Sequence, residues 1–292
     1  MADYPDFREI QKEDRSLFEA EFNNNPPKIS EFTFTNLYSW RDAYKFKFSF
    51  LGGLIILRSD SESEIRFFEP IGKGDKRAAI EKVLNDYKCV FIRLPEETKA
   101  LFTGGARFRV DLDMDNADYL YEAAELVKLQ GRKYDGKRNL IKKFESSYSY
   151  EYVKMDGANA RESLNFEEKW CSIKNCDNIM GLSKERIAIR EMAGNFSEFG
   201  LRGGAIKIQG NFSALAIAQK LNPGTLVMHV LKADPNINGL YQAMLHEFLS
   251  KEAEGFAYVN LEQDLGREGL RKSKQSYHPV EMIKKYTLQL AD

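Results

Sequence analysis

Cysteine and histidine are scarce in this 292-residue sequence, with three of each. Cys89, Cys171 and Cys176 are odd in number, and no His or Cys partners stand at zinc-like spacing, which argues against a disulfide scaffold and a metal site. The scattered histidines form no Ser-His-Asp or Cys-His arrangement. His229 alternates with apolar residues, which predicts a packed face, with a catalytic role as the less favoured alternative.

Long hydrophobic runs and an excess of one charge are also missing. The longest purely aliphatic stretch, residues 51–57, is far too short to span a bilayer, and the N-terminus lacks the cationic start and apolar core of a signal peptide. A formal net charge of -1 gives no global reason to expect nucleic acid or an anionic membrane as partner, although local basic clusters could bind either. We therefore expect a cytoplasmic protein.

The length and the 43% hydrophobic content predict two soluble domains, which we divide as residues 1–146 and 147–292. In the first half, period-two alternation predicts an antiparallel meander over residues 43–72, followed by a helix at 75–87 and a strand at 88–95. Helical spacing predicts further helices at 117–129 and 132–148.

The second half reads as a strand at 148–156, two helices, three strands between 203 and 234, a helix at 236–252, a strand at 256–264, a helix at 266–277 and a strand at 280–290. Three antiparallel strands followed by a helix and a strand on the far side require a splayed sheet. Ligands in open sheets bind where the strand arrangement switches, so we expect a site there.

The strand at 256–264 carries polar residues where a buried strand should be apolar. Alternation places Asn260, Glu262 and Asp264 on one face, which predicts a cavity beside it. A carboxylate there could take or orient the proton of an acceptor amine, with Glu262 as first choice and Asp264 as second. Alternatively, Asp264 caps the next helix and Glu262 pairs with Arg271 or Lys274.

Cations follow these carboxylates. Arg267, Arg271 and Lys274 recur at helical spacing and could hold an anionic carrier, or they form an ordinary solvated face. Tyr277, at the helix end, could protonate a departing oxygen or sulfur, or simply pack. Lys232 could reach a carrier phosphate or be an edge lysine.

The densest basic stretch lies at residues 132–143. Its residues Arg132, Lys133, Lys137 and Arg138 predict a contact for RNA backbone or anionic headgroups, with an inter-domain helix as the alternative.

Four segments, at 30–40, 129–144, 238–248 and 259–279, together resemble the C-terminal domain family of phosphatidylglycerol lysyltransferases. The resemblance implies an α+β fold of two tandem GNAT-like units, similar to acyl-CoA N-acyltransferases, with mixed, mostly antiparallel splayed sheets flanked by helices and a reduced first unit. It also implies a relation to Fem-type transferases, and hence acyl transfer from aminoacyl-tRNA. Those lysyltransferases carry a multi-spanning membrane region that we do not expect here, which favours a soluble small-molecule or peptide acceptor.

In the GNAT pattern a glycine-rich loop binds the pyrophosphate of coenzyme A. Here the corresponding segment keeps only Gly239 and adds the negative charge of Asp234. The segment 238–242 is instead similar to an N-G-x-Y-Q segment of Fem-type proteins, which implies that Asn238, Gly239, Tyr241 and Gln242 bind the carrier. A coenzyme A-dependent N-acyltransferase, using acetyl- or acyl-CoA, and a non-catalytic ligand-binding protein remain as alternatives.

Overall fold

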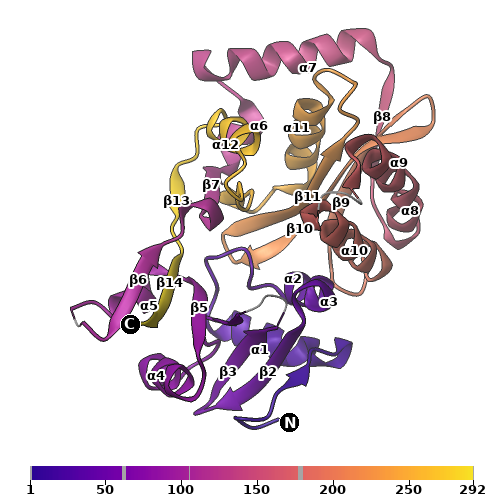
Figure 1. Ribbon diagram of the computed structural model, residues 1–292. Coiled ribbons are helices and arrows are strands. Elements are labelled where there is room, and N and C mark those ends of the chain that lie inside the picture. Colours follow the sequence, from indigo (N-terminus) through magenta and orange to yellow (C-terminus); the bar gives the residue numbers. More distant parts are fainter. Residues whose placement is uncertain (1, 61–63, 105, 177–179, 292) are drawn as a thin grey trace. The chain divides into compact units, whose positions relative to one another are not determined.

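The computed structural model describes residues 2–60, 64–104, 106–176 and 180–291 (Figure 1). The chain divides into two compact units. The first unit comprises Met1–Tyr119, Gln263–Lys272 and Met282–Asp292, and the second comprises Leu120–Glu262 and Ser273–Glu281. This division differs from the expected one near residue 146, because the chain enters the second unit earlier and its last strand returns to the sheet of the first.

The first unit contains a mixed sheet in the order β1-β2-β3-β4-β5-β14-β6. Its strands are β1 (Arg8–Glu9), β2 (Phe46–Leu51), β3 (Leu54–Ser59), β4 (Ile65–Phe68), β5 (Cys89–Leu94), β6 (Phe108–Leu112) and β14 (Tyr286–Leu290). Its helices are α1 (Arg15–Asn24), α2 (Phe34–Ser39), α3 (Arg41–Tyr44), α4 (Lys76–Asp86) and α5 (Glu96–Ala100), with 3-10 turns at Lys12–Asp14 and Met114–Asn116.

The predicted meander is present in this sheet, since β2, β3 and β4 pair in antiparallel order. The side chains of Ile56, Phe67, Ile80, Phe91 and Leu288 meet in one buried core between the sheet and α4. Burying each such side chain contributes about 1.5–3 kcal/mol, so this core accounts for the alternation read from the sequence.

The second unit contains a mixed sheet in the order β13-β7-β12-β11-β10-β9-β8. Its strands are β7 (Asp118–Glu122), β8 (Tyr150–Lys154), β9 (Arg202–Ile208), β10 (Asn211–Asn222), β11 (Thr225–Ala233), β12 (Tyr258–Asn260) and β13 (Glu281–Ile283). Its helices are α6 (Ala123–Lys128), α7 (Asp135–Ser147), α8 (Gly157–Glu162), α9 (Leu164–Lys174), α10 (Met180–Gly194), α11 (Leu240–Glu252) and α12 (Glu268–Gln275), with a 3-10 turn at Arg132–Tyr134. β7, β13 and α12 each cross a division between the units.

Helix α11 packs against α7 and the strands β9, β10 and β11. Leu240, Met244, Leu245 and Phe248 are buried on its inner face, as the spacing predicts. Most pairings of both sheets are antiparallel, and each sheet contains a parallel pair, β4 with β5 and β11 with β12. The prediction of an α+β fold with two mixed sheets flanked by helices is therefore confirmed.

Three secondary-structure predictions are wrong. Residues 117–129 are not one helix but the strand β7 followed by α6, because β7 pairs with β12 and tertiary pairing overrides the helical spacing. The strand expected at 256–264 ends at Asn260. The strand expected at 280–290 is two strands, β13 and β14.

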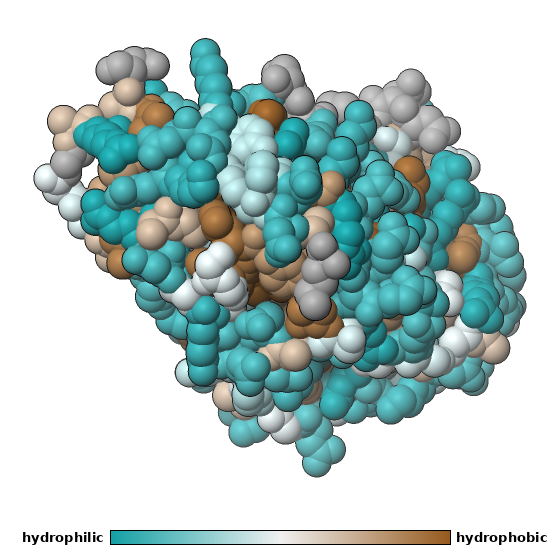
Figure 2. Space-filling view, turned by 90° about the horizontal axis from the view of Figure 1, so that it is seen from below, coloured by the Kyte–Doolittle hydropathy of each residue, from teal (hydrophilic) through white to brown (hydrophobic). Residues whose placement is uncertain are grey.

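The expectation against a disulfide is also wrong, since Cys171 and Cys176 form one across the end of α9. Cys89 is buried as a free thiol, and burial raises the pKa of this thiol to about 12. Among the described residues, no helix has both the length and the apolar character that a membrane crossing requires. Figure 2 shows one face of the molecule, on which hydrophilic residues predominate and hydrophobic residues appear in separate small areas.

Candidate functional site

The parallel strands β11 and β12 of the second unit differ in length. They pair through Thr225–Val227 and Tyr258–Asn260, and β11 then continues to Ala233 without β12 beside it. A β-bulge lies just beyond the pairing, because Met228 and Val230 face consecutive residues of β10 and His229 is left over. Bulges of this kind commonly re-aim side chains beside active sites. The splayed sheet that the strand order led us to expect here stays a prediction.

The chain turns sharply where β12 ends. The buried Asn260 side chain accepts a hydrogen bond of 2.7 Å from the backbone N–H of Glu262, which adopts a left-handed φ of 57°. A non-glycine residue in this conformation is strained, and such strain gathers at functional sites. The turn also corrects the predicted face: Asn260, Glu262 and Asp264 do not alternate along one strand. Lys274 Nζ donates to the carbonyl oxygen of Leu261 at 2.5 Å, so its ammonium group lies at this turn.

At this turn, the carboxylate of Glu262 contacts the imidazole of His229. Its Oε1 lies 2.9 Å from Nδ1 of His229, whose side chain is 1% exposed, whereas the Glu262 side chain is 23% exposed. The other ring nitrogen of His229, Nε2, is buried without a hydrogen-bond partner among the described residues. The side chain of His229 is buried, as its apolar neighbours suggested. Its contact with a carboxylate was not predicted from the alternation of residues along the strand.

Asp264 belongs to the first unit, where it is fully engaged. Its carboxylate accepts two hydrogen bonds from Arg271, at 2.8 and 3.0 Å, one from the hydroxyl of Tyr119 at 2.6 Å and one from the N–H of Gly266 at 2.8 Å. The Arg271 hydrogen bonds are the main reason that the pKa of Asp264 is lowered to about 2. A carboxylate so stabilised is a poor proton acceptor, and Arg271 is occupied by it and by Asp115.

Lys232 is buried at the end of β11. Its Nζ lies 2.9 Å from Oε2 of Glu185 and 3.5 Å from the ring centroid of Trp170. It is therefore neither an edge lysine nor a free phosphate ligand. Burial, with a smaller contribution from Glu185, raises the pKa of the neighbouring Tyr241 to about 12.

Backbone N–H groups in the loop before α11 donate hydrogen bonds to acceptors within the same loop. Asp234 accepts the N–H of Asn236 through its side chain and that of Ile237 through its backbone oxygen. Gly239 has a φ of +86°, and a Cβ there would clash with the carbonyl oxygen of Leu140, so packing requires this glycine. Asn238 is exposed and Gln242 is half-buried on α11.

Tyr277 is buried in the second unit, and burial raises its pKa. Lys137 of α7 lies over it, with Nζ 4.0 Å from the ring centroid, and donates to Ser276 Oγ at 2.6 Å. Burial lowers the pKa of Lys137. Tyr134 donates its hydroxyl hydrogen to the carbonyl oxygen of Tyr277 at 3.0 Å, which fixes the end of this segment.

The predicted basic cluster has internal partners. Lys133 forms an ion pair of 2.7 Å with Glu125, and Arg138 pairs with Asp135 and with backbone carbonyl groups. Arg132 is exposed at the start of the 3-10 turn. The contacts of Lys133 and Arg138 therefore hold the loop before α7.

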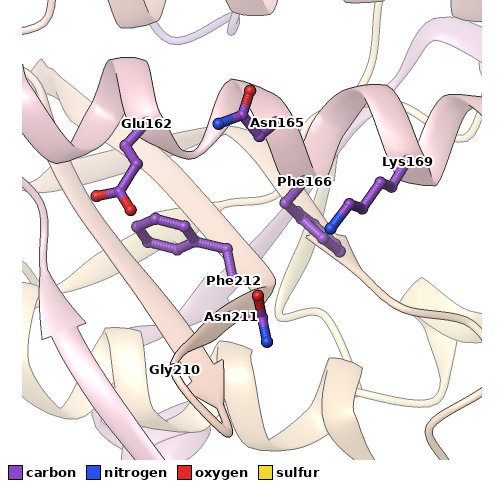
Figure 3. A pocket seen from close by; sticks show the side chains of 7 residues that line it. All are labelled: Glu162, Asn165, Phe166, Lys169, Gly210, Asn211 and Phe212. Atoms are coloured by element: carbon purple, nitrogen blue, oxygen red, sulfur yellow. The ribbon is translucent and has the colours of Figure 1, made fainter.

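A separate pocket of about 140 Å³ lies between α8, α9 and the β9–β10 turn. Figure 3 shows the side chains of Glu162, Asn165, Phe166 and Lys169 facing Asn211 and Phe212 across it, and Gly210 completes the lining. Its volume is well below the roughly 300–1,000 Å³ of typical ligand pockets. No residue predicted to bind substrate lines it.

The sequence matches the family described as phosphatidylglycerol lysyltransferase, C-terminal, over residues 22–289. No curated protein matches. A solved structure of a conserved protein from Bacteroides thetaiotaomicron is similar, with a TM-score of 0.90, 32% identity, and coverage of 98% of this chain and 99% of that one.

Two further solved structures share the fold. L-PGS from Bacillus licheniformis has a TM-score of 0.64 at 15% identity, over 99% of this chain and 93% of that one. FemX has a TM-score of 0.57 at 9% identity, over 97% and 96%. These likenesses agree with the fold class predicted from the sequence, and the family match makes the chain an acyltransferase-like domain.

Proposed function

Since this chain belongs to the family of phosphatidylglycerol lysyltransferase C-terminal domains, we propose that it transfers an aminoacyl group from aminoacyl-tRNA to an amine or hydroxyl acceptor. The observation that carries the proposal is the part-exposed carboxylate of Glu262, which lies just past the end of β12, where β11 continues without β12 beside it. A tRNA donor implies a cytoplasmic reaction.

The reaction requires one bond to form and one to break. The acceptor nitrogen or oxygen attacks the ester carbonyl of the aminoacyl group, and the bond from that carbonyl to the ribose oxygen of tRNA breaks. The acceptor must lose a proton during attack, and Glu262 governs its removal. The ribose oxygen must gain a proton, for which Tyr277 is our candidate because its hydroxyl lies in the segment just after α12 and is protonated at neutral pH like an ordinary phenol. Asn260 holds the turn that presents Glu262, and Lys274 adds a positive charge at that turn.

Coenzyme A is the less favoured carrier. A pyrophosphate binds free backbone amides at a helix N-terminus. Before α11, the amides of Asn236, Ile237 and Leu240 already donate within the loop, and the carboxylate of Asp234 stands among them. These contacts support the tRNA donor, for which Asn238, Tyr241 and Gln242 remain proposed contacts.

The basic side chains Arg132, Lys133, Lys137 and Arg138 are proposed contacts for the tRNA backbone. Contacts to phosphate release counterions, so binding should weaken steeply as salt rises. Retention on immobilised tRNA that persists at moderate salt would count against this contact. The Arg132→Gln variant is the cleanest probe, because among the described residues no internal partner holds this guanidinium group.

The test is a screen of charged tRNAs for transfer, with phosphatidylglycerol vesicles, soluble amines and peptides as acceptors. We expect the wild type to transfer one class of aminoacyl group and the Glu262→Gln variant to lose at least about 100-fold in rate. Asp115→Asn, which removes an exposed carboxylate of the first unit, is the matched control and should keep the rate. Thermal stabilisation by acetyl-CoA with no effect of tRNA would favour the coenzyme A-dependent alternative. Binding without turnover, unchanged in Glu262→Gln, would favour a non-catalytic ligand-binding protein.

A further inference from the structure

His229 has no role in the reaction as set out so far, although it touches the carboxylate at its centre. The contact joins Nδ1 of His229 to Oε1 of Glu262 at 2.9 Å. Both residues lie in the second unit, His229 in the bulge of β11 and Glu262 in the turn after β12. The pair therefore lies just beyond the paired segments of β11 and β12.

The contact decides which ring nitrogen holds the proton. An ionised carboxylate only accepts hydrogen bonds, so Nδ1 of a neutral His229 must carry the hydrogen and Nε2 must carry the free lone pair. This is the arrangement of a general base that a carboxylate orients and whose protonated form the same carboxylate stabilises.

Nε2 of His229 is buried and lacks a hydrogen-bond partner among the described residues. The side chain is 1% exposed, so Nε2 does not face bulk solvent. Most buried polar atoms have a hydrogen-bond partner, so an atom without one calls for an explanation, and a catalytic role is one such explanation. A donor N–H or O–H of a bound acceptor supplies such a partner.

The bulge gives an independent reason. In a regular strand, the apolar pattern of β11 would continue through position 229. Instead, His229 is an extra residue that interrupts the pairing of β11 with β10 in the middle of the strand. A bulge bends a strand and redirects one side chain. Here the redirected side chain is the imidazole that meets Glu262.

We infer that Nε2 of His229 takes the acceptor proton and that Glu262 acts as the residue that positions His229. The inference rests on the proposed function. As the acceptor attacks the ester carbonyl, its proton moves to Nε2 and the carbon–oxygen bond to the ribose breaks. The ribose oxygen leaves with the electron pair and takes the proton of Tyr277, and His229 and Tyr277 regain their starting states by exchange with solvent.

The first variant is His229→Asn, whose amide nitrogen takes the place of Nδ1 and keeps the hydrogen bond to Glu262 without a base at Nε2. We expect the single-turnover transfer rate to fall about 10²–10⁴-fold with little change in the thermal unfolding midpoint. His246→Asn is the matched control, because His246 is a half-buried histidine of the same unit whose Nε2 contacts the carbonyl oxygen of Val127. It should keep the wild-type rate.

The second variant, His229→Ala, tests whether the imidazole of His229 acts as a base or only fills space. Added imidazole should restore part of its transfer rate, whereas pyrazole, which has the same shape and little basicity, should not. Equal rescue by both compounds, or a His229→Asn rate within about threefold of the wild type, overturns the inference while transfer by the wild type upholds the proposed function. Absence of transfer by the wild type from every charged tRNA overturns the proposed function itself, and the role of His229 with it.

Discussion

The Asp264→Asn variant should lose stability at neutral pH and little at strongly acidic pH. In the wild type, Arg271 donates hydrogen bonds to both carboxylate oxygens of Asp264, whose side chain is 2% exposed. Asparagine has the same shape, and its oxygen can still accept the N–H of Gly266. Its amide nitrogen has no charge for Arg271 and cannot accept the hydrogen bonds that Oδ2 takes from Arg271 Nε and the Tyr119 hydroxyl. The substitution therefore removes the ion pair and these two hydrogen bonds.

The magnitude follows from the pKa of the carboxyl group. Its ordinary value of 3.8 falls to about 2 in the folded protein. At about 1.4 kcal/mol per pKa unit, this gap corresponds to about 2–3 kcal/mol of stability before solvent screening is considered. The Arg271 side chain is 39% exposed, and solvent weakens the pair, so we expect a loss of about 1–2 kcal/mol.

The sign of the pH dependence is fixed by the lowered pKa. The contribution is fully present above the unfolded value of 3.8 and disappears as the pH falls through about 2, because the folded carboxyl group is then protonated as well. Urea unfolding followed by tryptophan fluorescence, at neutral pH and at several acidic values, measures the difference between wild type and variant. Asp115→Asn is the control, because its side chain is 62% exposed and also bonds Arg271. A loss that does not shrink with acidity, or one no larger than that of the control, would refute the reasoning.

Three further predictions follow from burial, backbone conformation and the disulfide. Gly239→Ala should destabilise the protein by about 1–3 kcal/mol more than Gly131→Ala in urea unfolding; both glycines have φ near +85°, but only the first would clash with a backbone oxygen, so equal losses would contradict the packing. Lys232→Met should cost about 2–4 kcal/mol in the same assay, because it leaves a carboxylate without its ammonium partner, and an unchanged free energy of unfolding would contradict the ion pair. Alkylation of the denatured, unreduced protein should leave Cys171 and Cys176 unlabelled in mass spectra, and labelling of both without reductant would contradict the disulfide.

Elements with strong local periodicity could be predicted from the sequence. The meander β2–β3–β4 and the helices α4 and α11 have regular apolar spacing and compact turns, and their buried faces are those expected. Helix α1 was missed, since its sequence is mostly polar and Phe18 alone is buried in it. Strand β7 was read as a helix because the partner that makes it a strand, β12, lies far along the chain.

The candidate site was predicted in part. Asn260 is the last residue of β12 and Glu262 lies two residues beyond it, and residue type together with the predicted strand order pointed to both. The contact of Glu262 with His229 could not be predicted from the sequence. It depends on a β-bulge at His229, which no residue type in β11 indicates, and on the left-handed backbone conformation of Glu262. The same turn separates Glu262 from Asp264, which strict alternation had placed on one face.

The two parallel pairs differ in the carboxylate that follows the shorter strand of each pair, and this difference supports our proposal that the chemistry lies in the second unit. In the first unit, β4 and β5 part after Phe68 and Ile92, and the next residue, Glu69, is buried with one oxygen bonded to Lys76 Nζ at 2.5 Å and to Thr98 Oγ1 at 2.6 Å. That carboxylate already has both a countercharge and a hydroxyl donor from its own chain, so a ligand would gain nothing by meeting it. In the second unit, a part-exposed carboxylate and an imidazole with an unsatisfied nitrogen lie beside the end of β12. This contrast between the two carboxylates is the reason that we propose the reacting centre in the second unit.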